Sequence, residues 1–402
     1  MFKAHWGTAC GDKAMMRPIY LDYNATTPHA PEVIAVMRPI LEEHFGNPSS
    51  SHWYGRVARE AVEQARAQVA ALLNCSSAEV VFTSGGTESN NFAIQGIARA
   101  RRDRGRHIIT TQIEHPAVTV VCERLQREGC DVTYIPVDAR GLVDVADIAR
   151  AIRPETILIT VMHANNEVGT VQPVGEIGSL ARSRGIAFHT DAAQSAGKIP
   201  VSVQSMAADL VSLAGHKLYA PMGVGALYVR TGVTVERWML GAGQESGRRA
   251  GTENVLEIVG LGKACEIALR DLAINADHMR RMRDRLEQGL LERIPKLRLN
   301  GFLEQRLPNT SSVSFEGVAA DVLLNEIQDR VAASAGAACH SGQVRISHVL
   351  AAMQVPENWA KGTVRFSTGR NTSDSDIDQV IDIVSAAVIR LRAAEEFPWA
   401  AI

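Results

Sequence analysis

The sequence has almost no charge imbalance and no long apolar segment. Its 42 Lys and Arg against 44 Asp and Glu give a net charge of −2, so charge balance implies no polyanionic partner such as nucleic acid. No apolar run approaches the roughly 18 residues that cross a bilayer, so we expect no membrane association. Residues 1–17 lack the apolar core and cleavage site of a secretory signal, which favours a cytoplasmic location.

Cysteine is sparse. The six cysteines include no CxxC pair, which argues against a disulfide scaffold, a zinc ribbon or any metal site. Cys339 differs from the rest because residues 334–342 are small and favour no regular element, so we expect an exposed, flexible thiol suited to a nucleophile. Cys339 is also compatible with an ordinary loop cysteine. The adjacent His340 suggests a shared metal ion, but no further residues have the spacing of metal ligands.

The chain does contain a long alternation of β-rich runs and helical segments, from about residue 32 to 265. This predicts an α/β fold with a mostly parallel, doubly wound sheet and ligands at the carboxyl ends of its strands. A long charged helix, expected at 268–293, then leads into mixed strands and helices. We predict an N-terminal extension at 1–18, a large domain at 30–274, and a smaller α+β domain formed by 19–29 and 275–402.

Two predicted strand ends carry the residues that narrow the function most. One apolar run stops at Gly215-His216-Lys217, and another stops at Asp191. A lysine amine binds the aldehyde of pyridoxal 5′-phosphate (PLP) as a Schiff base, and a carboxylate keeps its pyridine nitrogen protonated. The pair therefore predicts a PLP site.

A glycine-rich turn at 83–91 follows a strand and opens a helix. Such a turn lets backbone N–H groups, with the Thr87 hydroxyl, surround a phosphate. Alone it is equally consistent with a plain strand-to-helix turn capped by Thr87 or Ser84. Beside Lys217 and Asp191 it supplies the phosphate anchor that PLP needs.

Further polar residues close other strands. His115 is placed for stacking on a cofactor ring and for proton transfer, although a lone histidine is more often a satisfied core residue. Asn166 is suited to contact the cofactor or a substrate carboxylate, or else to cap a turn. In 364–370, either Arg365 or Arg370 is able to clamp a carboxylate, and either is also compatible with a structural role.

Taken in order, these motifs resemble the cysteine desulfurases of the class-V aminotransferase group, which have PLP fold type I. The resemblance runs from about Ile19 to Arg370, through stretches at 20–28, 45–49, 83–90, 114–115, 163–167, 191–194, 215–217, 249–252 and 364–366. It implies conversion of L-cysteine to L-alanine, with a persulfide on Cys339 that passes to sulfur-acceptor or scaffold proteins. Iron–sulfur cluster assembly, tRNA thiolation and selenium metabolism all stay open as the pathway served.

The resemblance also implies a role for each matching residue. Lys217 is the cofactor lysine and proton shuttle, His115 stacks on the ring and helps deprotonate the substrate thiol, and Cys339 is the persulfide cysteine. The remaining implied contacts are Asp191 and Gln194 with the ring, Asn166 and Arg365 with the substrate carboxylate, Gly86, Thr87 and His216 with the phosphate, and Thr252 with the phosphate from the partner subunit of a homodimer.

Two departures from the family pattern leave the activity open. Ala214 stands where the family often has a phosphate-binding serine. The stretches 243–245, 251–254 and 336–341 resemble selenocysteine lyases, whose substrate is L-selenocysteine and whose products are selenide and L-alanine. A class-V aminotransferase or β-eliminating enzyme that does not need Cys339 would also carry these motifs, as would a non-catalytic PLP-fold assembly platform.

Overall fold

The large sheet is mostly parallel, as the sequence predicts. The computed structural model describes residues 17–335, 337–340 and 343–396, and the predicted extension at 1–18 therefore lies almost wholly outside the described residues. Within them, the larger sheet has seven strands in the order β2-β8-β7-β6-β5-β3-β4. Only β8 runs antiparallel to its neighbours in this part of the chain. The strands are β2 (Val80–Thr83), β3 (His107–Thr111), β4 (Asp131–Ile135), β5 (Thr156–Thr160), β6 (Ala187–Asp191), β7 (Leu210–Ala214) and β8 (Gly225–Val229).

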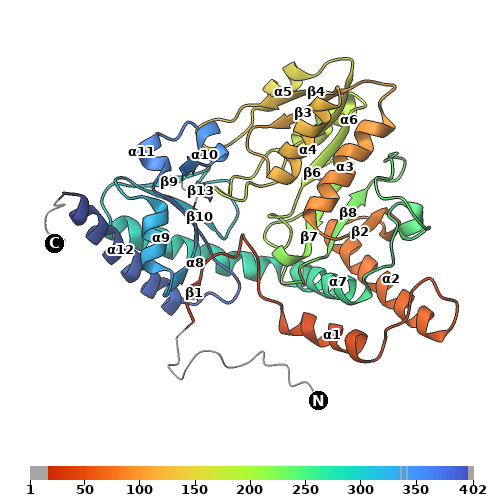
Figure 1. The fold of residues 1–402 in the computed structure, drawn as a ribbon, viewed down its shortest axis with the longest axis horizontal. Helices are drawn as coiled ribbons and strands as arrows, with labels where there is room; N and C mark the ends of the chain where they lie inside the picture. Colours follow the sequence, from red (N-terminus) through yellow and green to blue (C-terminus); the bar gives the residue numbers. More distant parts are fainter. Residues whose placement is uncertain (1–16, 336, 341–342, 397–402) are drawn as a thin grey trace.

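Helices cover both faces of this sheet. In Figure 1, α1, α2 and α7 lie side by side at one end of the molecule, while α3 crosses the strands. The helices of this part are α1 (Pro31–Glu42), α2 (Trp53–Leu73), α3 (Gly86–Ala100), α4 (Pro116–Arg127), α5 (Val145–Ala151), α6 (Val174–Ser183) and α7 (Val255–Arg270), with short 3₁₀ turns η1 (Ser77–Glu79), η2 (Gly215–Lys217) and η3 (Glu245–Gly247).

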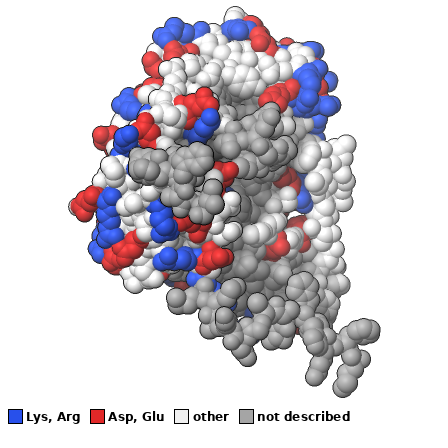
Figure 2. Space-filling model, turned by 60° about the vertical axis from the view of Figure 1, so that its left-hand side comes forward, with Lys and Arg blue, Asp and Glu red and all other residues white. Residues whose placement is uncertain are grey.

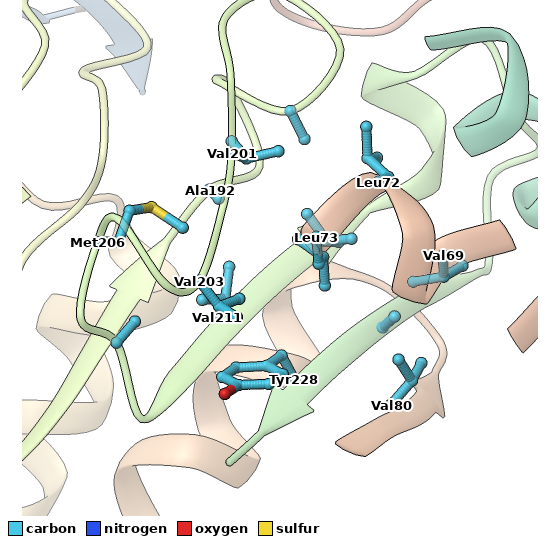
Figure 3. Packing of buried hydrophobic residues seen from close by; sticks show 14 of the residues in the cluster. Val69, Leu72, Leu73, Val80, Ala192, Val201, Val203, Met206, Val211 and Tyr228 are labelled. Carbon is cyan, nitrogen blue, oxygen red and sulfur yellow. The ribbon is translucent and has the colours of Figure 1, made fainter. Parts of the chain in front are cut away.

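The sheet is held by apolar packing on each face, because its strands other than the edge strand β4 are buried along their whole length. Figure 3 shows one part of this core, where Leu73 at the end of α2 points toward Val211 of β7 and Tyr228 of β8. Full burial of such side chains contributes about 1.5–3 kcal/mol each. The rigid sheet fixes the strand ends at which the polar candidates lie.

A second, antiparallel sheet follows in the chain, in the order β12-β15-β10-β9. Its strands are β9 (Leu297–Asn300), β10 (Thr310–Phe315), β12 (Ser334–Ala335) and β15 (Thr363–Ser367), and a short parallel pair joins β1 (Ile19–Tyr20) to β11 (Val331–Ala332). The helices here are α8 (Leu272–Arg293), α9 (Ala320–Ile327), α10 (His348–Ala352), α11 (Glu357–Ala360) and α12 (Asp374–Glu396). A separate apolar cluster, with Phe315, Phe366 and Val384 at its centre, packs between this sheet and its helices.

The long charged helix begins later than the sequence predicts. We expected it at 268–293, whereas α7 continues through Arg270 and α8 begins at Leu272. The break is at Asp271, whose φ of −104° and ψ of 11° are not helical, and whose carboxylate pairs with the Arg270 guanidinium. Helical periodicity alone does not reveal such a one-residue interruption.

The expectation that residues 334–342 form no regular element is wrong for most of them. Besides β12, residues Ala337–His340 form β13, which pairs with β14 (Gln343–Ile346) as an antiparallel hairpin. Cross-strand hydrogen bonds satisfy the backbone whatever the side chains, so small residues do not prevent strand formation.

Charges of both signs are mixed on the surface. Figure 2 shows acidic and basic side chains interspersed over the left part of one face. Exposed ion pairs such as Arg285–Asp378, at 2.8 Å between α8 and α12, belong to this pattern and contribute little stability individually. Among the described residues, no helix combines the length and hydropathy needed to cross a membrane.

Candidate active site

A cavity of about 410 Å³ lies at the carboxyl ends of the strands and gathers most of the predicted site residues. This is where a doubly wound sheet binds its ligands. The predicted residues that line it are Gly86, Thr87, His115, Asn166, Asp191, Gln194, His216, Lys217 and Arg365, joined by residues that the sequence analysis did not single out, among them Asn24 and Asn90.

Lys217 lies in η2, directly after β7, and its amine is held by the backbone of an N-terminal loop. Nζ donates to the carbonyl oxygens of Asn24 and Ala25, the latter at 2.7 Å. Burial, and then the neighbouring Arg365 guanidinium, lower the pKa of Lys217 to about 8. A substantial fraction of the amine is therefore neutral near pH 8, as attack on an aldehyde requires.

Asp191, the last residue of β6, is a nearly buried carboxylate with an oriented set of donors. Oδ2 accepts from Asn90 Nδ2 at 2.6 Å, and Oδ1 accepts from the Ala193 N–H at 2.9 Å. These contacts hold the carboxylate at the cavity wall. Asn90 lies within a motif that the sequence analysis quoted, but its contact with Asp191 joins two elements 101 positions apart.

The first turn of α3 forms an anion site. Gly85 stands at the N-cap with φ of 148°, a conformation that favours glycine, and no side chain of the described residues caps the helix. An added Cβ on Gly86 would come within 3.2 Å of Ala214 Cβ, so the backbone here is closely approached. Free N–H groups at a helix start attract a phosphate.

His115 is the N-cap of α4, and its Nδ1 accepts from the Ala117 N–H at 3.1 Å. Burial lowers its pKa, so the ring is neutral near pH 7 and carries its proton on Nε2. In this tautomer the ring donates a hydrogen bond, and uptake of a thiol proton at Nδ1 requires the Ala117 contact to break. Its predicted role as a base remains a prediction.

Arg365, in β15, is the arginine of 364–370 that lines this cavity. Nη1 donates to the Asn166 carbonyl at 3.0 Å and Nη2 pairs with Asp22 at 2.8 Å. Its Nε is buried and has no partner among the described residues. Arg370 instead lines a smaller neighbouring cavity, with its guanidinium 4.3 Å from the Tyr219 ring centre.

Asn24 connects several of these residues and was missed by the sequence analysis. Its backbone oxygen accepts from Lys217 Nζ and from Gln194 Nε2, the latter at 2.9 Å. Its side-chain Nδ2 donates to the Asn166 carbonyl at 3.2 Å. Only the resemblance of residues 20–28 to the family pattern pointed to this loop.

His216 precedes Lys217, and its Nδ1 lies 3.3 Å from the Thr26 hydroxyl. Burial, and then the adjacent Lys217, lower the pKa of His216 to about 4, so this ring is neutral at physiological pH. A neutral imidazole contributes a hydrogen bond to a phosphate and no positive charge.

Two predicted site residues are not among the described side chains that line this cavity. Thr252 is exposed and lies outside the cavity lining, on the segment that precedes α7. The backbone of Cys339 lies in β13, opposite Val344 of β14, and its side chain is outside the described part of the chain.

The residues present fit PLP. That cofactor has an anionic phosphate, a pyridine nitrogen and an aldehyde. The α3 N-terminus with Gly86, Thr87 and His216 would hold the phosphate, Asp191 the pyridine nitrogen, and Lys217 the aldehyde carbon. Gln194 would contact the phenolic oxygen. One cavity thus offers a partner of suitable charge for each group.

Comparisons with known proteins agree with this chemistry. The aminotransferase class-V family model matches residues 19–380. A cysteine desulfurase IscS from Dictyoglomus turgidum is 44% identical over 384 residues, which cover 95% of this chain and 98% of that protein. A solved NifS-like protein has a TM-score of 0.88 at 36% identity, covering 93% of this chain and 100% of its own. SspA, solved in complex with cysteine, has a TM-score of 0.79 at 38% identity, covering 88% of this chain and 99% of its own.

Proposed function

Since the chain belongs to the cysteine desulfurases of the class-V aminotransferase family, we propose that it converts L-cysteine to L-alanine and passes the sulfur on through a persulfide at Cys339. The observation that carries the proposal is the cavity in which Lys217, Asp191 and the open α3 N-terminus meet. The PLP of this family, when bound, acts as an electron sink that makes the substrate Cα–H and Cβ–S bonds breakable.

The residues of the chain supply binding and proton movement. Arg365 is oriented at the cavity wall by Asp22 and by the Asn166 carbonyl, and its positively charged guanidinium attracts the carboxylate of cysteine. Lys217, with a pKa lowered to about 8 by burial and by Arg365, accepts and returns the proton of the substrate Cα. His115 offers an Nε2–H that stabilises a substrate thiolate.

Cys339 takes the sulfur atom in this proposal. Its thiolate attacks the substrate sulfur and forms an S–S bond, while the electron pair of the broken Cβ–S bond passes to Cβ. That carbon takes up one proton, equal to the one that the Cys339 thiol gave up, so a persulfide stays on Cys339 and the carbon skeleton departs as L-alanine. The cysteines whose side chains are described are poor nucleophiles by comparison. Burial raises the pKa of Cys75, Cys122 and Cys265 to about 12 and also raises that of Cys130.

We further propose a homodimer in which Thr252 of one subunit reaches the phosphate site of the other. An aromatic patch formed by Phe45, Trp53 and Tyr54 supports an interface, since 81% of Phe45 and 54% of Trp53 is exposed. The Phe45 and Tyr54 rings stack at 5.3 Å, which makes the patch contiguous. Light scattering on Phe45→Glu tests this: we expect monomers with weakened PLP binding, and a dimer with normal PLP affinity contradicts the proposal.

The enzymatic proposal is tested by measuring alanine and persulfide formed from L-cysteine and from L-selenocysteine. We expect alanine from L-cysteine in the wild type, almost none with Lys217→Ala, and loss of persulfide with Cys339→Ser. Cys130→Ser is the matched control and should behave as wild type. Full cysteine turnover by Cys339→Ser would favour a β-eliminating enzyme, and a very large preference for L-selenocysteine would favour a selenocysteine lyase.

A further inference from the structure

Lys198 is a buried lysine that the proposed reaction does not use. It lies in the turn after β6, and only 5% of its surface is exposed. No carboxylate lies within ion-pair distance of its amine in the part of the chain that the structure describes. Burying an unpaired ammonium is costly, so a lysine at this position needs a physical reason.

The amine contacts two side-chain amides of the candidate site. Nζ lies 2.9 Å from Oε1 of Gln194 and 3.0 Å from Oδ1 of Asn24. The amine has at least two N–H groups in either protonation state, so it can donate to both amide oxygens at once, and both amides turn their oxygen atoms toward Lys198. The Gln194 amide nitrogen then points the other way, where Nε2 donates to the Asn24 backbone oxygen at 2.9 Å.

This arrangement leaves the second N–H of the Gln194 amide, and not its oxygen, for the cavity that Gln194 lines. If the amide turned over, the oxygen would face the cavity and would repel the anionic phenolic oxygen of PLP. We propose that Lys198 is a positioning residue that fixes the Gln194 amide so that it presents an N–H donor to the cofactor. The inference rests on the proposed function, because it requires PLP in this cavity.

The electrostatic setting supports a role through hydrogen bonds and not through an ion pair. The charged groups that act on Lys198 are Lys217 and Arg365, and both are cations. Burial lowers the pKa of Lys198 well below its usual range, and these two groups lower it further. Asn24 Oδ1 also accepts from Asn309 Nδ2 at 2.9 Å. Among the described residues, Lys198 is the donor that reaches Gln194 Oε1, while the Asn24 backbone oxygen holds the other end of the same amide.

The test is a spectrophotometric pH titration of the PLP-loaded protein. A donor to the phenolic oxygen stabilises its anion and lowers the pH at which the bound cofactor gives up its proton. We expect Lys198→Met to raise the titration midpoint by about one pH unit. Lys263→Met on α7 is the matched control and should leave the midpoint unchanged, because its partner is Glu266 at the surface.

A double variant separates positioning from a direct charge effect. Gln194→Met removes the donor, so adding Lys198→Met to it should shift the midpoint no further. An equal further shift would mean that Lys198 acts by its charge, and an unchanged midpoint in folded Lys198→Met would also overturn the inference. If Lys198→Met does not fold, Lys198→Gln is used in its place. A glutamine amide both donates and accepts, so it cannot hold the Gln194 amide in one orientation, and the midpoint should again rise. A wild-type midpoint in Lys198→Gln would contradict the inference. A wild type without visible cofactor absorbance would instead refute the proposed function.

Discussion

Gly86, the first residue of α3, faces Ala214, the last residue of β7, so closely that a Cβ on Gly86 would lie 3.2 Å from the Ala214 methyl group. Both residues line the cavity where the phosphate is proposed to bind. The family often has a serine where this chain has Ala214, so one side of the site lacks a hydroxyl donor.

Ala214→Ser should therefore tighten PLP binding. A hydroxyl donated to a charged phosphate contributes about 1.5 kcal/mol, which corresponds to roughly tenfold in affinity. Gly86→Ala should act in the opposite direction, by about fivefold, because its methyl group crowds Ala214 and the phosphate. Equilibrium dialysis of apoprotein with PLP measures both. Equal affinity in all three proteins would place the phosphate elsewhere.

Asn90→Leu should weaken PLP binding about tenfold. The substitution keeps the branched shape and the number of side-chain heavy atoms but removes the 2.6 Å hydrogen bond to Asp191, and a hydrogen bond to a charged group contributes about 1.5–3 kcal/mol. Without this donor, the carboxylate is free to turn away from the pyridine nitrogen. Gln95→Ala, on the same helix, is the control and should bind PLP as wild type does. Matching affinities for the two variants would contradict a role for Asn90.

Much of the site was predictable because its residues end β-strands. Lys217, Asp191 and His115 each follow an apolar run, and the carboxyl ends of parallel strands converge at one edge of a sheet. Asn24 was not predictable in this way, since it belongs to no strand and its N–H donates to the Ser367 hydroxyl, 343 positions away. Lys198 was missed for a similar reason: its role depends on which amides it meets, and a sequence pattern does not give that.

Arg365→Lys should raise the KM for L-cysteine at least about tenfold, with a smaller fall in kcat. Lysine lacks the planar guanidinium that pairs with Asp22 and reaches the Asn166 carbonyl at the wall of the cavity. Arg370→Lys is the matched control, because Arg370 lines the neighbouring cavity and stacks on Tyr219. Steady-state kinetics on both variants decide between the two arginines. A larger KM effect at Arg370 would reverse the assignment.

Glu114→Gln should make the stability of the protein less dependent on pH. Glu114 is fully buried, and burial raises the pKa of its carboxyl to about 8, although donation from Met162 and Thr111 lowers it. Because the folded pKa lies above the unfolded value, this group contributes stability that is complete below about pH 4.5 and is lost as the pH rises through 8.

The glutamine variant has no proton to lose at this position. Urea unfolding of the two apoproteins is measured at pH 5.5, 7 and 8. The free energy of unfolding of Glu114→Gln should increase relative to that of wild type as the pH rises, by up to about 1.4 kcal/mol per pH unit. Glu79→Gln is the control. Burial alone would raise the pKa of Glu79, but hydrogen bonds donated by Thr231 and Ser76 lower it overall, so its carboxylate stays ionised throughout this pH range. A constant difference between wild type and Glu114→Gln would mean that Glu114 is already ionised in the folded protein. The buried carboxyl next to His115 in the sequence would then contribute a negative charge beside the active site.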